Sequence, residues 1–264
     1  MVGQQGAKII KTMEIKTIYE DNDVLVVNKP AGIVVFPEGQ TLKNEEKTLI
    51  DYLTEQFPHL KDVGEPPRYG IVHRLDKDTS GVLLVAKSNE GLIFLQKQFK
   101  NREVEKKYVC LVEGTITTDH GRIETLIGRA HGDKRKQKAY SLGDPNPVGK
   151  REAITEYKVL SRYKDYTLLE VEIKTGRRHQ IRCHFSYLQH PIAGDKLYGF
   201  KNSKIPAGLT RQFLHSAYLK IQLPFDEAQG RPSGEIKEFK SELPEELNNI
   251  IDNLKATNKV SSEN

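Results

Sequence analysis

The sequence HRLDKDTSG at residues 73–81 runs directly into the apolar sequence VLLVA at residues 82–86. The first stretch contains basic side chains, two carboxylates, two hydroxyls and a glycine. The second has the length and the β-branched content of a buried strand. Dense polar chemistry at the end of a rigid strand is typical of a functional site that the scaffold positions. Composition alone also allows a simpler interpretation, which is a polar turn before a strand.

The surrounding sequence predicts more strands and a few helices. Strand patterns occur at residues 17–20, 24–27, 106–112, 154–160, 166–173 and 218–223. Apolar side chains at helical spacing predict helices that begin after Thr48 and Ser88, near Arg178 and near Pro244. Residues 114–153 predict a hairpin and a mobile basic loop. Many strands with a few interspersed helices indicate a mixed α+β domain.

The composition argues against several classes of protein. No apolar run approaches the ~20 residues that cross a bilayer, and residues 1–13 lack the apolar core of a secretory signal. The two cysteines, Cys110 and Cys183, give neither a disulfide framework nor zinc-ligand spacing. We therefore expect a cytoplasmic protein with no membrane partner.

Positive charge is concentrated locally in this sequence. The net charge is only +5, but basic residues cluster at 134–138 and 176–178. Such clusters attract a phosphate backbone. For any single cluster, ordinary solvated surface lysines are an equally simple explanation.

Several blocks of the sequence resemble the RluA-type pseudouridine synthases. The main ones are residues 70–81, 107–109 and 175–184, and Asn28–Gly32 and His190–Asp195 agree with them in order. The resemblance runs from about Ile15 to about Leu254. It implies a mostly antiparallel, twisted central sheet with flanking helices and a central catalytic cleft.

The same resemblance suggests how the chain is divided. We expect a flexible N-terminal tail at residues 1–13, the catalytic domain at 14–254 and a flexible C-terminal tail at 255–264. Members of this family often carry a small RNA-binding domain before the catalytic domain. Too little sequence precedes Ile15 to hold one, so we expect the catalytic domain alone, acting as a monomer.

Pseudouridine formation breaks the bond from C1′ to N1 of a uridine, turns the base and rejoins it through C5. The reaction involves no redox change and no phosphate transfer, so the resemblance implies neither a cofactor nor a metal. The sequence contains no glycine-rich dinucleotide or P-loop motif. His179, Cys183 and His184 lie close together in the sequence, but they lack the partner pair of the usual zinc site.

By resemblance, the catalytic residues are Asp76, Tyr108 and Arg182. Asp76 would attack the sugar or the base, or assist deprotonation at C2′, and Arg182 would hold it ionised. Tyr108 would pack on the target base. Without the resemblance, Asp76 could be a turn-capping aspartate and Tyr108 an ordinary strand tyrosine.

The expected RNA-binding residues surround these positions. By resemblance, Arg74 enters the base stack that the extruded uridine leaves. Contacts to RNA are also expected from His73, Arg177, Arg178 and Lys136, although His73 could instead be structural. Asp78 is expected to be structural or capping, and Lys29, at a strand end, solvated.

The leading hypothesis is therefore an isomerase that converts uridines in structured RNA, with large-subunit ribosomal RNA as the expected substrate. Transfer RNA is the alternative substrate. A second class is a non-catalytic RNA-binding protein of the same fold. A third is a hydrolase such as a nucleosidase, which would release free uracil.

Overall fold

The computed structural model describes residues 15–38, 46–224 and 234–262. Within these ranges, ten strands form one sheet: β1 (Lys16–Glu20), β2 (Val24–Lys29), β3 (Ser80–Ala86), β4 (Glu105–Glu113), β5 (His120–Arg129), β6 (Gln137–Tyr140), β7 (Arg151–Arg162), β8 (Tyr166–Ile173), β9 (Leu214–Gln222) and β10 (Ile236–Lys240). Their order is β1-β2-β3-β9-β4-β8-β7-β5-β6, with β10 paired to β9. Among the strand pairs of the described residues, β3 and β9 alone run parallel. The expectation of a mixed, mostly antiparallel sheet is confirmed.

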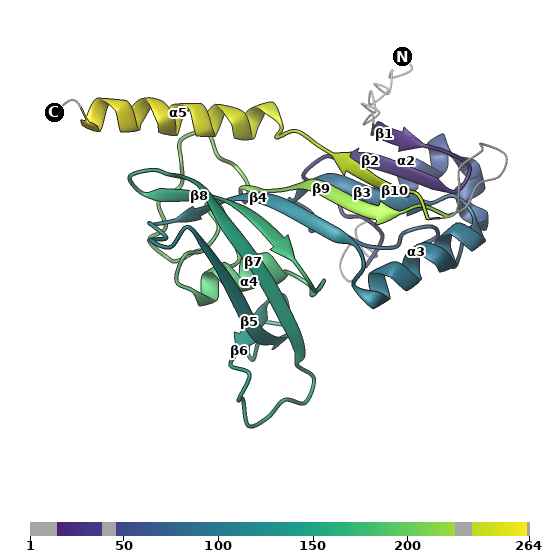
Figure 1. Ribbon diagram of the computed structural model, residues 1–264, viewed down its shortest axis with the longest axis horizontal. Coiled ribbons are helices and arrows are strands. Elements are labelled where there is room, and N and C mark those ends of the chain that lie inside the picture. The colour runs from purple at the N-terminus through teal and green to yellow at the C-terminus, as the bar shows by residue number, and fades with distance from the viewer. Residues whose placement is uncertain (1–14, 39–45, 225–233, 263–264) are drawn as a thin grey trace, which may run out of the picture.

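Helices lie against this sheet (Figure 1): α2 (Leu49–Gln56), the short 3-10 helix η1 (Pro58–Asp62), α3 (Asn89–Asn101), α4 (Gln180–Tyr187) and α5 (Glu245–Ser262). The predicted start of α2 is confirmed, because the Asp51 carboxylate accepts hydrogen bonds from the backbone and the hydroxyl of Thr48. The predicted start of α3 is also confirmed, because the Ser88 hydroxyl accepts from the backbone N–H of Gly91.

Strand β3 lies inside the sheet, between β2 and β9, and is buried on both faces. Leu83 and Val85 belong to the largest apolar cluster, on one face. Val82 and Leu84 belong to a second cluster, on the face that α3 covers. Burial on both faces explains why residues 82–86 form a continuous apolar run instead of an alternating one. The polar stretch at residues 73–79 therefore enters a rigid element.

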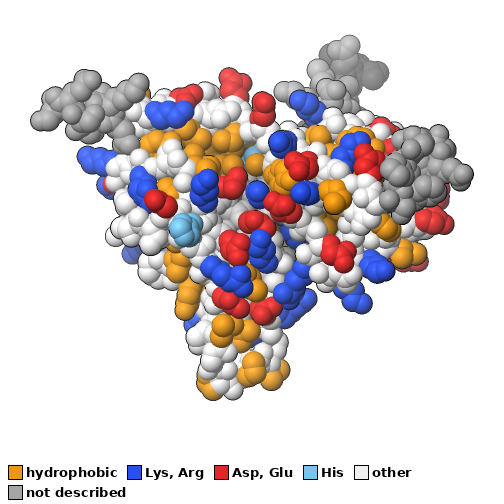
Figure 2. All heavy atoms as spheres, in the orientation of Figure 1, with side chains coloured by type: hydrophobic (Ala, Val, Ile, Leu, Met, Phe, Trp, Pro, Cys, Tyr) orange, Lys and Arg blue, Asp and Glu red, His pale blue; other side chains and the backbone are white. Residues whose placement is uncertain are grey.

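The face drawn in Figure 2 carries both signs of charge. Lys and Arg side chains lie among Asp and Glu side chains over most of it, which agrees with the modest net charge of +5. Among the described residues, none of the helices combines the length and the apolar character needed to cross a membrane.

Some elements differ from the predictions. α5 continues through Ser262, so residues 255–262 are helical rather than an irregular tail; no Gly or Pro interrupts this polar segment. β6 takes up part of the expected basic loop, and β10 was not predicted because its side chains are mostly polar and exposed. The expected N-terminal tail at 1–13 lies outside the described residues.

Candidate active site

The loop at residues 76–79, which leads into β3, is anchored by the side chain of Lys29. This side chain is fully buried, and its ammonium donates to the backbone carbonyls of Pro30 at 2.8 Å, Lys77 at 3.1 Å and Thr79 at 2.9 Å. Burial lowers the pKa of Lys29 to about 7, although Asp76 and Asp78 oppose that effect. The expectation of a solvated lysine is therefore wrong, because the loop folds over the end of β2 and encloses it.

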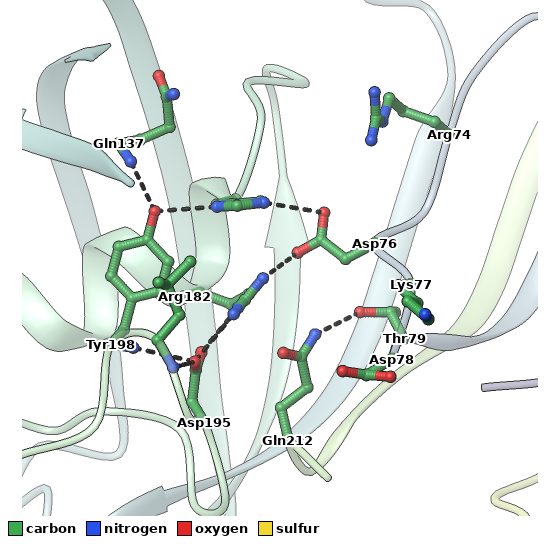
Figure 3. A network of polar contacts seen from close by, with 12 residues as sticks. Arg74, Asp76, Lys77, Asp78, Thr79, Gln137, Arg182, Asp195, Tyr198 and Gln212 are labelled. Carbon is green, nitrogen blue, oxygen red and sulfur yellow. Dashed lines mark hydrogen bonds and ion pairs between the residues drawn. The ribbon is translucent and has the colours of Figure 1, made fainter. Parts of the chain in front are cut away.

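Arg211 and Gln212 also hold this loop by hydrogen bonds. The Arg211 guanidinium donates to the Asp78 carbonyl at 2.9 Å and to the Ser80 hydroxyl at 3.0 Å. The Gln212 amide donates to the Thr79 hydroxyl at 2.9 Å (Figure 3). Because Lys29 and Arg211 bind its backbone carbonyls, the loop presents Asp76 in a fixed position.

Arg182, on α4, joins two carboxylates. Its guanidinium donates to Asp76 at 2.8 Å, and through its other nitrogens to both oxygens of Asp195 at 2.7 and 2.9 Å (Figure 3). Arg182 and Asp195 are both buried. The expected pairing of Asp76 with Arg182 is present. Asp195, the last residue of the family-like block at 190–195, was not predicted as a site residue, and it fixes the arginine by accepting two hydrogen bonds.

These neighbours keep Asp76 ionised. Burial by itself raises the pKa of a carboxyl group. The pKa of Asp76 nevertheless lies below its ordinary value, and at neutral pH, where His179 is uncharged, the positive charges of Arg182 and Arg74 hold it ionised. The result is a desolvated carboxylate that is negatively charged at neutral pH, which suits charge stabilisation or nucleophilic attack.

Tyr108, on β4, lies at the same site. Its side chain is buried, and its hydroxyl is hydrogen-bonded to Ser216. Burial and the nearby Asp76 charge raise the pKa of Tyr108, so the phenol is protonated at neutral pH. Tyr108, Asp76 and Arg182 line one open cavity of about 570 Å³. The structure therefore brings the three expected catalytic residues together.

A second chain of polar contacts reaches Asp76 through His179. The Tyr198 hydroxyl accepts from the backbone N–H of Gln137 at 2.7 Å and lies 3.0 Å from Nδ1 of His179 (Figure 3). Since the Tyr198 oxygen already accepts one proton, its own O–H is available for Nδ1. The ring proton of His179 then sits on Nε2, which faces Asp76 at 3.9 Å.

The sequence alone predicts neither this role of His179 nor any role for Tyr198 and Gln137. His179 adopts the left-handed conformation, with φ 55°, where it caps α4. Burial lowers the pKa of His179 to about 4, and Arg182 and Arg178 act in the same direction while Asp76 opposes them. A neutral histidine in an uncommon backbone conformation is consistent with a constrained site.

The expected RNA-binding residues are arranged less uniformly. Arg74 pairs with Glu38 through two nitrogens and lies over the Phe36 ring. Arg178 is exposed, and Arg177 is half-buried beside the Glu152 carbonyl. Lys136 lies 5.9 Å from the centre of the Tyr198 ring.

His73 makes inward contacts that fit its structural interpretation. Its Nε2 accepts from the backbone N–H of Leu84 at 2.9 Å, and its ring stacks on Phe99 with 4.9 Å between the centres. The sequence alone gives no sign of this stacking, because the two residues lie on separate elements.

The cluster His179, Cys183 and His184 is not arranged as a metal site. His184 is fully buried, and its two ring nitrogens lie 2.9 and 2.8 Å from the hydroxyls of Thr125 and Thr155. Within the described ranges, no three His, Cys, Asp or Glu side chains converge as metal ligands.

Comparison with known proteins agrees with this geometry. The family described as RNA pseudouridylate synthase matches residues 23–187. An uncharacterised RNA pseudouridine synthase of Aquifex aeolicus is 44% identical over 202 residues, which cover 75% of this chain and 60% of the relative. The ribosomal large subunit pseudouridine synthase D of Vibrio cholerae is 38% identical over 247 residues, which cover 89% of this chain and 69% of the relative.

Solved structures share the fold. The human RNA pseudouridylate synthase domain containing 1 protein has a TM-score of 0.66 at 25% identity, covering 95% of this chain and 98% of its own. The human domain containing 4 protein has a TM-score of 0.69 at 24% identity, covering 91% and 93% respectively.

Proposed function

This chain belongs to the RNA pseudouridylate synthase family, and on that premise we propose that it isomerises uridine to pseudouridine in structured RNA, with Asp76 as the catalytic carboxylate. The observation that carries the proposal is the meeting of Asp76, Tyr108 and Arg182 in one open cavity. Breaking the bond from C1′ to N1 builds positive charge at C1′, and an ionised carboxylate stabilises or captures such charge.

Each residue has a part in this scheme. Arg182 keeps Asp76 ionised, and Asp195 holds Arg182 in place. Tyr108, protonated and buried, offers a flat ring for the extruded uracil and a hydroxyl for proton transfer. Arg74 occupies the space that the base leaves in the RNA. Attack on the sugar, attack on the base and assistance at C2′ are the three routes open to Asp76.

Large-subunit ribosomal RNA is the substrate that we propose, acted on by a monomer in the cytoplasm. The relative named for the ribosomal large subunit supports this choice. Transfer RNA is the alternative substrate, and a comparison of the modified RNA classes separates the two.

The first experiment maps pseudouridine across total RNA from cells with and without the gene, and from cells that carry Asp76→Asn. Loss at one or a few uridines of large-subunit ribosomal RNA is expected in both the deletion and the variant. Asp76→Asn should keep RNA affinity and lower turnover by at least about a hundredfold. Tyr108→Phe should likewise retain RNA binding but lose much of the turnover.

The other two classes of function give different outcomes. An Asp76→Asn strain with an unaltered pseudouridine map and phenotype would favour a non-catalytic RNA-binding protein. Release of free uracil from the RNA would favour a hydrolase, whereas the isomerase leaves the mass of the RNA unchanged.

A further inference from the structure

The active-site cavity has a strong charge imbalance. Among the described residues that line it, ten are Lys or Arg, and Asp76 is the one carboxylate. Several of these cations are already neutralised by carboxylates outside the lining. Arg182 pairs with Asp195, Arg74 with Glu38, and Lys174 with Glu172. Arg102 pairs with Glu152 at the rim, and Lys106 lines the cavity with no ion pair among the described residues.

Lys106, on β4, is a cation of the cavity lining that has no ion-pair partner among the described residues. Its side chain is 7% exposed. Among the described residues, its ammonium has no carboxylate within ion-pair distance and no hydrogen-bond acceptor, and it lies over the Phe99 ring, 5.5 Å from the ring centre. The ammonium is not among the fully buried polar atoms without a partner, so it reaches the open cavity that Lys106 lines. An anion in the cavity would supply the missing partner.

The surroundings of Lys106 are rigid. The Phe99 ring beneath the ammonium stacks on His73, and His73 is in turn bound to the backbone of β3. Burial lowers the pKa of Lys106 to about 8, with Glu172 offsetting part of that effect. The side chain therefore still carries a charge at neutral pH, and a bound anion would favour that charged form.

Three arginines line the cavity together with Lys106. Arg102, Arg151 and Arg177 lie along the wall of the same cavity. Burial lowers the pKa of Arg177, and the charges of Arg151 and Arg102 act in the same direction. Arg102 and Arg151 are exposed, and Arg102 forms an ion pair with the Glu152 carboxylate at 3.0 Å. The four cations of this group lie near two carboxylates, Glu152 and Glu172, so the group carries excess positive charge.

We propose that Lys106, with Arg102, Arg151 and Arg177, forms a phosphate subsite for the RNA backbone next to the target uridine. The inference rests on the proposed function, because it places the uridine at Asp76 in the same cavity. Guanidinium groups match the geometry of phosphate oxygens, and an ammonium supplies a compact charge. RNA is the ligand that carries such phosphates at short, regular spacing from a base.

The test compares Lys106→Met with Lys107→Met. Lys107 is the neighbouring lysine on β4; it pairs with Glu105 at 2.9 Å and does not line the cavity. Both variants are made in the Asp76→Asn background, so that binding is measured without turnover. The probe is an unmodified transcript of large-subunit ribosomal RNA, titrated at several salt concentrations.

Lys106→Met should weaken binding about tenfold and reduce the slope of log affinity against log salt by about one. Lys107→Met should match its parent, and Lys106→Arg should restore most of the affinity. A short RNA that carries the mapped target can be made with an uncharged methylphosphonate at one linkage. At the linkage next to the target, this change should weaken RNA binding by the parent protein but not by Lys106→Met.

Unchanged affinity and salt slope in Lys106→Met would overturn the subsite, as would equal losses in the two lysine variants. Thermal melting shows whether Lys106→Met is folded. If it is not, Arg151→Gln replaces it, because the exposed Arg151 side chain can change without disturbing the core. The same reduction in the salt slope of RNA binding is expected for that variant. Failure of the proposed function would appear differently, as a pseudouridine map that the deletion and Asp76→Asn leave unaltered, together with normal Lys106-dependent RNA binding.

Discussion

At the scale of single residues, the site is organised around charges that share partners. Arg182 is bound by Asp76 and by Asp195, so one guanidinium both orients the candidate catalytic carboxylate and is itself oriented. The Arg182 guanidinium also lies 5.1 Å from the centre of the Tyr198 ring. Tyr198 thus contacts both groups that face Asp76, namely Arg182 and His179.

The hydroxyl of Tyr198 should fix the tautomer of His179. In Tyr198→Phe, Nδ1 loses its donor, and the ring proton should distribute between the two nitrogens. We expect RNA affinity to stay within about twofold and turnover to fall roughly tenfold, less than the loss of a general acid or base itself, because His179 acts only through Asp76. Nitrogen-15 NMR of the histidine ring reports the tautomer directly. A wild-type ring protonated on Nδ1 would contradict this assignment.

At the scale of elements, the pairing of β3 with β9 sets the position of the candidate site. It is a short parallel contact in which Ser80 lies beside His215 and Gly81 beside Ser216. Gly81 has φ +115°, and a Cβ atom there would come within 2.1 Å of the Ser216 carbonyl oxygen. A glycine is therefore required at the point where the catalytic loop joins the sheet.

Gly81→Ala should damage both stability and activity. The added carbon meets backbone atoms, so β3 and β9 must separate, and the free energy of unfolding should fall by more than about 1 kcal/mol. Urea denaturation measures that loss, and turnover should fall with it because Asp76 lies on the displaced loop. Gly143→Ala is the control, since a Cβ there has no neighbour within 4 Å. Equal stability of the two variants would refute the argument.

At the scale of the whole molecule, buried neutral histidines link stability to pH. Burial lowers the pKa of His184 to about 4 and that of His73 to about 3, where Lys106 contributes. In the unfolded chain both groups return toward the ordinary value of about 6.5. Below that pH the unfolded chain binds protons that the folded protein does not, so acid favours unfolding.

We expect the free energy of unfolding to fall as pH drops from about 6.5 toward 4, by on the order of 1 kcal/mol per pH unit for each such histidine. Urea denaturation between about pH 7 and pH 5 measures the decline. His184→Gln keeps a hydrogen-bonding side chain between Thr125 and Thr155 but cannot titrate. Its free energy of unfolding should therefore fall less steeply with pH than that of the wild type, by the contribution of one proton. Identical pH profiles of the two proteins would show that His184 is not the group responsible.

Much of the architecture follows from local sequence. The apolar run at 82–86 is a buried strand, and the helices after Thr48 and Ser88 begin as their capping residues indicate. The C-terminal end of α5 and the edge strand β10 were not predictable in this way, because polar side chains occur equally in tails, exposed helices and edge strands.

By itself, the sequence determined the family resemblance, the central buried strand and the expected meeting of Asp76, Tyr108 and Arg182. The tertiary structure alone decided that Lys29 is enclosed and that Asp195 and the pair of His179 and Tyr198 support Asp76. It also decided that Lys106 faces the cavity over the Phe99 ring, with no carboxylate at ion-pair distance in the described part of the chain. The physical reason is distance along the chain. Spacing and capping patterns report contacts within a few residues, whereas Asp76 and Arg182 are 106 positions apart, and burial is a property of the assembled sheet.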